Sequence, residues 1–224
     1  MPESTYLLYS VGEVAVAGAM ALSPQMCEHG MRPAWTGYVA VQDVDAAATK
    51  IQSLGGAVYR PAEDIPGVGR FAVVGDPQGA AFNLFKAEPG STPPPEAPMG
   101  TPGYCGWREL QAADGQSAFD FYAAMFGWDK DMAVEMGPGF GVYQTFRARG
   151  AGQAMGGMMT KGAELPVPMW IYYFGVEAAQ AGSDRVKASG GQALMAPHEV
   201  PGGSWIVPCL DPQGAVFALL APKL

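Results

Sequence analysis

The chain has 224 residues, 49% hydrophobic and 15% charged, so it can bury enough apolar surface to offset the entropy of folding. Its net charge of −8, with no cluster of Lys or Arg, excludes nucleic acid as a partner because a phosphate backbone would be repelled. No apolar run reaches the roughly 18 to 20 residues that span a bilayer, and no Lys or Arg precedes Arg32 to begin a secretory signal. With three widely spaced cysteines, these features predict a cytoplasmic protein with free thiols and no membrane partner.

The first half of the chain predicts a hairpin and then a β-α-β-β-β module. Two extended segments flank the turn residues Gly12 and Glu13. An amphipathic helix is expected at Val44–Leu54, with Asp43 as its N-cap and Gly55 after its end. The expected strands are Thr5–Ser10, Val14–Ser23, Trp35–Val41, Ala57–Arg60, Gly69–Val74 and Ala80–Lys86.

Residues 89–102 are rich in Pro and Gly and predict a linker between a lobe at 1–88 and a lobe at 103–224. The second lobe predicts two further β-α-β-β-β modules in series. Asp114 is expected to cap its first helix and Gly127 to end it. The expected elements are a strand at Tyr104–Ala112, a helix at Gln116–Phe126, strands at Val142–Arg147, Gln153–Thr160 and Met169–Gly175, a helix at Ala178–Ser189, and three strands ending with Ala215–Ala221.

An internal repeat relates the two halves of the chain. The segment that begins Asp76-Pro77-Gln78-Gly79 recurs 135 positions later as Asp211-Pro212-Gln213-Gly214, and each copy predicts a tight turn that leads into a buried strand. The same offset of 135 relates Trp35 to Trp170, Gly55-Gly56 to Gly190-Gly191, and Pro66-Gly67 to Pro201-Gly202. Four landmarks in register predict a duplicated structural unit.

The first lobe is shorter at its front than the second. Aligning Gly18 with Gly156 leaves the first lobe without a counterpart of residues 103–138, which include the opening strand and helix of a module. We expect the sheet edge left uncovered there to favour a homodimer through this lobe.

The modules resemble the vicinal oxygen chelate superfamily, which includes glyoxalase I, bleomycin-resistance proteins and extradiol dioxygenases. The resemblance rests on the repeated Asp-Pro-Gln-Gly strand, Gly190-Gly191, Pro201-Gly202, and the run Ala118–Tyr122 followed by Phe126-Gly127-Trp128. It implies an α+β fold in which paired β-α-β-β-β modules form curved mixed sheets around a cavity that often holds a divalent metal.

The metal ligands that the resemblance implies are not conventional ones in this chain. Carrying the ligand positions over places Trp107, Ile171 and Thr36 on first strands, and Ala218 and Asn83 on last strands. A divalent ion in an apolar cavity needs several carboxylate or imidazole donors, and the two histidines, His29 and His198, read as loop residues. We therefore predict no metal and no cofactor.

The strand that contains Glu109 carries the predicted site. Because side chains alternate along a strand, Trp107, Glu109 and Gln111 share one face. A carboxylate among apolar neighbours is a candidate general base or ligand anchor; the alternative is a structural ion pair with Arg147 or Arg149. The residues predicted to line the pocket with Glu109 are Trp107, Gln111, Tyr143, Met155, Met158, Ile171, Tyr173, Trp205 and Ala218, unless these side chains simply fill one another as core. The segment Gly137–Gly141 is predicted to form a hairpin beside the mouth of the pocket.

Three functions follow from this sequence. The first is a metal-free glyoxalase-like or bleomycin-resistance-like protein that binds a small hydrophobic or aromatic molecule, with sequestration or a simple proton transfer by Glu109. The second is a metal-dependent lyase or dioxygenase. The third is a structural or interaction protein without catalysis.

Overall fold

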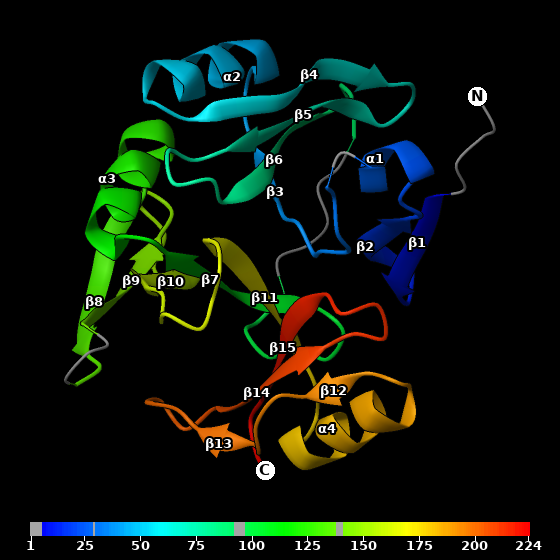
Figure 1. Cartoon of the computed structure of the whole chain (residues 1–224), viewed down its shortest axis with the longest axis vertical. Coiled ribbons are helices and arrows are strands. Elements are labelled where there is room, and N and C mark those ends of the chain that lie inside the picture. The colour runs from blue at the N-terminus through cyan, green and yellow to red at the C-terminus, as the bar shows by residue number, and fades with distance from the viewer. Residues whose placement is uncertain (1–5, 29, 92–96, 138–140) are drawn as a thin grey trace. The chain divides into compact units, whose positions relative to one another are not determined.

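The computed structural model describes residues 6–28, 30–91, 97–137 and 141–224, which form two compact units, each assembled from separate segments (Figure 1). Unit 1 comprises residues 1–35, 94–107 and 172–224, and unit 2 comprises residues 36–93 and 108–171. His29 and most of the predicted hairpin Gly137–Gly141 lie outside the described residues.

Unit 2 contains two β-α-β-β-β modules, and the first confirms the predicted order. Strand β3 is parallel to β6, and β6, β5 and β4 are antiparallel neighbours. The side chain of Asp43 accepts a hydrogen bond from the backbone of Ala46, as expected for an N-cap. The elements are β3 (Tyr38–Ala40), α2 (Val44–Ser53), β4 (Ala57–Ile65), β5 (Gly69–Gly75) and β6 (Ala81–Ala87).

The second module of unit 2 has the same order. Its first strand is parallel to its last, β10, and β10, β9 and β8 are antiparallel neighbours. Asp114 caps α3 by accepting from the Ser117 N–H at 2.6 Å, and Gly127 ends the helix with a φ of 71°, as predicted. The elements are β7 (Cys105–Ala112), α3 (Gly115–Phe126), β8 (Asp129–Glu135), β9 (Val142–Arg147) and β10 (Gly156–Thr160). The first residues of β7, 105–107, belong to unit 1.

The core of unit 2 is an aromatic cluster around Tyr122, whose side chain is fully buried. The Tyr122 ring stacks on Trp128 at 5.3 Å and meets Trp170 edge-on at 5.3 Å. Trp128 stacks in turn on the buried Phe146 at 4.6 Å. Offset and edge-on aromatic pairs of this kind contribute beyond the area they bury, so α3 is fixed firmly to its sheet.

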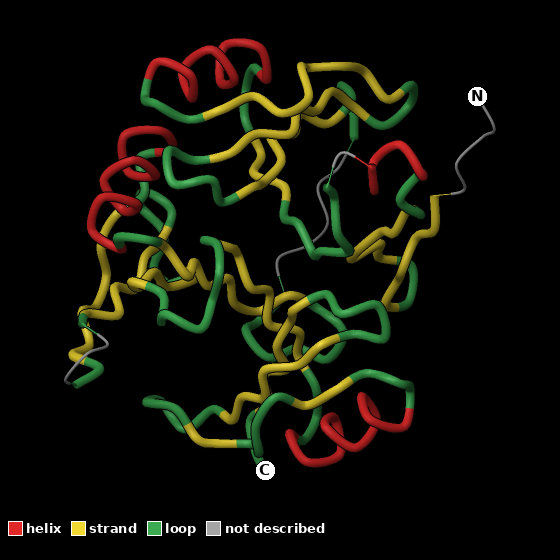
Figure 2. Tube along the Cα trace, in the orientation of Figure 1, coloured by secondary structure: helices red, strands yellow, loops and turns green. Residues whose placement is uncertain are grey.

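Unit 1 combines the N-terminal hairpin with the last module of the chain. Its sheet runs β12-β14-β15-β11, with β15 parallel to β11, and α4 packs against β14 and β15 (Figure 2). Ala179, Val207, Cys209 and Leu219 form the core between helix and sheet. The elements are β1 (Tyr6–Val11), β2 (Val14–Met20), α1 (Pro24–Glu28), β11 (Met169–Gly175), α4 (Ala179–Ala188), β12 (Gln192–Ala193), β13 (His198–Glu199), β14 (Trp205–Leu210) and β15 (Val216–Ala221). The first residues of β11, 169–171, belong to unit 2.

The repeated Asp-Pro-Gln-Gly segments form turns with the same hydrogen bonds. In each, one carboxylate oxygen of the aspartate accepts from the backbone two and four residues later, at 2.9–3.0 Å. The glycines, Gly79 and Gly214, adopt left-handed φ values of 92° and 85°. The predicted tight turns before β6 and β15 are confirmed.

Candidate functional site

The strand β7 presents Glu109 on the face of the unit 2 sheet opposite the one that α3 covers. Glu109 is paired with Gly157 on β10, while the next residue along, Leu110, is paired with Met158. Leu110 and Met158 are fully buried, as is Phe146 on the same face. Because neighbouring positions alternate between faces, Glu109 and Gly157 lie on the side away from this core.

The Glu109 carboxylate accepts side-chain hydrogen bonds from Tyr143 and Gln111. Tyr143 on β9 donates its hydroxyl to Oε2 at 3.0 Å, and Gln111 donates its amide to Oε1 at 2.6 Å. The second bond confirms that Glu109 and Gln111 share a face. Two donors on one carboxylate fix its position and favour its use as a hydrogen-bond acceptor.

Because Gly157 has no side chain, the Tyr143 side chain can cross β10 and reach Glu109. Gly157 lies on β10, between the strands that carry the two side chains. A Cβ atom at this position would overlap the Tyr143 ring, so the phenol passes directly over the glycine. The close approach explains why a residue without a side chain occupies the middle of this strand.

Of the two arginines considered as structural ion-pair partners of Glu109, Arg147 and Arg149, the first is engaged elsewhere. Arg147 instead donates to Asp131 at 2.9 Å.

The structure places the remaining predicted residues of unit 2 on both faces. Met158 does not join Glu109, because the register turns it into the core on the opposite face. Met155 is half-buried, and its carbonyl accepts from the backbone of Arg108 at the start of this strand pair. Ile171 is buried and alternates with Trp170, which packs on the α3 side.

The other four predicted residues belong to unit 1. Tyr173 and Ala218 are register partners on β11 and β15, so they share a face, and both are buried. Trp205 lies on the other face, where it packs against the α4 core. Trp107 is half-buried, and its carbonyl accepts a hydrogen bond from Cys105.

The donors around Glu109 do not fit a divalent metal. One carboxylate, one phenol and one carboxamide fall short of the several carboxylate or imidazole ligands that such an ion takes. Within residues 6–28, 30–91, 97–137 and 141–224, no three His, Cys, Asp or Glu side chains converge on one point. His198 instead contacts the carbonyl of Ala196 at 3.3 Å.

A buried polar trio in unit 2 was not identified from the sequence as a structural centre. The Tyr122 hydroxyl donates to Asp76 Oδ2 at 3.1 Å and accepts from the Trp170 indole N–H at 3.0 Å. Burial raises the pKa of the Asp76 carboxyl, and hydrogen bonds from the Ala80 and Gln78 backbone and from Tyr122 oppose that rise. The internal repeat was the sequence signal that could have pointed to this trio, because it contains the pairs Asp76/Asp211 and Trp35/Trp170.

The most informative comparison is with a curated relative, since no family model matches the chain. The Mycobacterium tuberculosis protein CFP32, which its name proposes as a glyoxylase, is 36% identical over 97% of this chain and 80% of its own length. A Mn(II)-bound glyoxalase from Novosphingobium aromaticivorans has the same fold, with a TM-score of 0.58 and 15% identity over 83% of this chain and 62% of that one. The chain belongs to the vicinal oxygen chelate superfamily.

Other members of the superfamily resemble the chain too. The anthracycline biosynthesis protein DauV of a Streptomyces species is 34% identical over 86% of this chain and 67% of its own length. The 2,2',3-trihydroxybiphenyl 1,2-dioxygenase of Sphingomonas wittichii has a TM-score of 0.57 at 14% identity, over 85% of this chain and 71% of that one. The α+β class with mixed sheets is confirmed. Across the described part of the chain, no helix is both long and apolar enough to cross a membrane.

Proposed function

We propose that this protein binds a small hydrophobic or aromatic molecule without a metal ion, with Glu109 as the polar anchor. The observation that carries the proposal is the Glu109 carboxylate, held by Tyr143 and Gln111 on the sheet face opposite α3. A fixed acceptor beside an aromatic ring suits a ligand that offers a hydroxyl group within a flat apolar framework. Sequestration, or a proton transfer to Glu109, is the chemistry that this arrangement supports.

Two features favour an aromatic ligand and a metal-free site. The protein DauV, a relative at 34% identity, is named for anthracycline biosynthesis, and anthracyclines are polycyclic aromatic compounds that carry hydroxyl groups. The donors around Glu109 are suited to hydrogen bonding and poorly suited to coordination. We therefore propose hydroxylated planar polycyclic compounds as the ligand class.

The proposal is tested by a thermal-shift screen of hydroxyanthraquinones against the wild-type chain and two variants. Glu109→Gln keeps the shape and removes the charge, whereas Tyr143→Phe removes one of the two donors that hold the carboxylate. A charge-assisted hydrogen bond contributes about 1.5–3 kcal/mol, so Glu109→Gln should weaken binding about 10-fold to 100-fold. Glu135→Gln, at an exposed position on β8, is the matched control and should bind like the wild type.

The two other candidate functions give different results in the same assay. A metal-dependent lyase or dioxygenase would be stabilised by Mn²⁺, Ni²⁺ or Zn²⁺ and destabilised by a chelator. An interaction protein without a small-molecule site would show no compound-dependent shift in any variant. Either result would refute metal-free binding at Glu109 and favour the function that predicts that result.

A further inference from the structure

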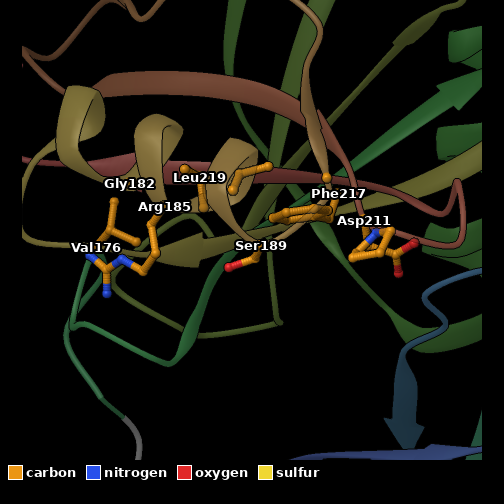
Figure 3. A pocket seen from close by; sticks show the side chains of 10 residues that line it. Val176, Gly182, Arg185, Ser189, Asp211, Phe217 and Leu219 are labelled. Carbon is orange, nitrogen blue, oxygen red and sulfur yellow. The ribbon is translucent and has the colours of Figure 1, made fainter.

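Unit 1 has an open groove between α4, the Asp211 turn and β15. Its volume is about 250 Å³, and its lining is mainly apolar, with Arg185 and Asp211 as charged groups. In the view of Figure 3, Phe217 lies between these two charged side chains along the groove.

Lining residues of the groove correspond, at the offset of the internal repeat, to residues of unit 2, several of which contact α3. Arg185, Asp211 and Phe217 stand 135 positions after Lys50, Asp76 and Phe82. The same offset relates the lining residues Val186 and Leu219 to Ile51 and Leu84, both fully buried in unit 2.

In unit 2, these counterparts bind α3 directly. Lys50 donates to the α3 carbonyls of Ala124 and Met125 at 2.7 and 3.1 Å, near the C-terminus where helix carbonyls lack partners. Phe82 packs on Tyr122 with ring centroids 5.6 Å apart. Gln78 clamps the N-cap of α3, because its amide bonds both the backbone N–H and the carbonyl of Asp114, at 2.8 and 2.9 Å. The counterpart of Gln78 in unit 1 is Gln213.

Two atoms of unit 1 that correspond to hydrogen-bonding groups contacting α3, Trp35 Nε1 and Asp211 Oδ2, have no hydrogen-bond partner among the described residues. The Tyr122 hydroxyl bridges Trp170 and Asp76, whose counterparts in unit 1 are Trp35 and Asp211. The Trp35 indole nitrogen is buried and has no hydrogen-bond partner among the described residues, and its ring packs against Phe217 of the groove at 6.4 Å.

Asp211 and Arg185 repeat this pattern. Asp211 uses Oδ1 for its turn, as Asp76 does, and no described group is hydrogen-bonded to its Oδ2. Arg185 makes no ion pair with any described residue, although Lys187 beside it pairs with Asp184. A buried indole N–H without a partner destabilises the fold, and an occupant of the groove that accepts from it would relieve this cost.

The N-terminal hairpin extends the correspondence. In β1 and β2, the Tyr6 ring covers Gly18 so closely that a Cβ atom there would overlap it, as Tyr143 covers Gly157 in unit 2. The structural counterpart of Gly18 is therefore Gly157, one residue after the Gly156 that the sequence alignment paired with it. Unit 1 therefore contains the counterparts of the last two strands of the α3 module and of the surface that receives α3, but no described helix in the position of α3.

We propose that this groove is a docking site for an amphipathic aromatic helix of the α3 type, carried by a polypeptide other than residues 1–224. The helix has an N-cap beside Gln213, a tyrosine whose hydroxyl bridges Trp35 Nε1 and Asp211 Oδ2, and C-terminal carbonyls that accept from Arg185. The α3 of a second copy is a poorer occupant, because its residues Phe119, Phe121, Tyr122 and Met125 are already buried within unit 2.

The probe is a labelled synthetic peptide with the sequence of residues 113–128, titrated into the full chain by fluorescence anisotropy. A matched peptide carries phenylalanine at the position of Tyr122. The wild-type peptide should bind saturably, and the matched peptide about tenfold more weakly, because it lacks two hydrogen bonds of about 0.5–1.5 kcal/mol each. Arg185→Glu should weaken binding at least tenfold, whereas Lys187→Glu, an exposed change on the same helix, should not.

A second readout reports on the bridging hydroxyl itself. The indole N–H resonance of Trp35, assigned in ¹⁵N-labelled protein by its loss in Trp35→Phe, should move downfield with the wild-type peptide and remain in place with the phenylalanine peptide. Absence of saturable binding, or binding insensitive to Arg185→Glu, overturns the proposal. So does a concentration-dependent dimer that Arg185→Glu abolishes, since the occupant would then be a second copy.

Discussion

Replacing Tyr122 with phenylalanine tests the buried trio of unit 2. The change keeps the aromatic ring, which is fully buried, and removes only the hydroxyl. The Trp170 N–H then loses its acceptor, and Asp76 Oδ2 loses a donor. Leaving a buried polar group unpaired costs about 1–3 kcal/mol. Two groups lose a partner here, but Asp76 keeps its hydrogen bonds from the backbone of Gln78 and Ala80. We therefore expect the free energy of unfolding to fall by about 2–4 kcal/mol.

The loss of stability caused by Tyr122→Phe should depend on pH. Burial raises the pKa of Asp76 above its usual value of 3.8, while the Tyr122 hydroxyl lowers it. A carboxyl with a raised pKa in the folded state destabilises the fold as pH rises through that pKa. Removing the hydroxyl raises the pKa of Asp76 further, so the penalty should be larger at pH 7 than at pH 3.

The assay is urea denaturation of the wild type and Tyr122→Phe at both pH values, with an unchanged slope as the test of two-state behaviour. Tyr59→Phe is the control, since the Tyr59 side chain is exposed, and it should change stability by less than about 0.5 kcal/mol. A Tyr122→Phe penalty no larger than that of the control would refute the role assigned to the trio.

Three further predictions concern single residues. Burial raises the pKa of the Cys209 thiol to about 11, so a thiol reagent at pH 8 should label it only after unfolding; rapid labelling in the native protein would contradict this. Gly157→Ala should displace the Tyr143 ring from Glu109 and abolish the compound-dependent thermal shift, and an unchanged shift would count against the proposed anchor. The Ser117 N–H lowers the pKa of Asp114, so the stability that Asp114 contributes is present above its unfolded pKa near 3.8 and lost as pH falls through the folded value. The stability difference between wild type and Asp114→Ala should therefore shrink toward pH 2, and a pH-independent difference would exclude this origin.

Local patterns predicted most of the elements because each carried its own boundary signals. The caps Asp43 and Asp114 and the stop at Gly127 define two helices within a residue or two of their observed ends. Strand β8 was missed because it is mostly exposed and begins with charged residues, so it lacks clear alternation. The short helix α1 was missed because its five residues read as a turn.

The candidate site was less predictable, since faces depend on strand register. Alternation correctly joined Glu109 and Gln111, whose side chains are hydrogen-bonded. It could not predict the sheet face on which Met158 lies, because that face is set by the pairing of Met158 with Leu110 on another strand. Tyr143 reaches Glu109 only because Gly157 intervenes, a relation between three strands that no local pattern records. The lobe boundaries, the cytoplasmic location and the homodimer stay predictions.

Metal-free binding at Glu109 can be measured by calorimetric titration of the best hydroxyanthraquinone into the wild-type chain, once with chelator and once with Mn²⁺. We expect the same dissociation constant in both conditions and a loss of affinity of at least tenfold with Glu109→Gln. Binding that appears only with Mn²⁺, or that Glu109→Gln leaves unchanged, would contradict a metal-free site anchored by Glu109.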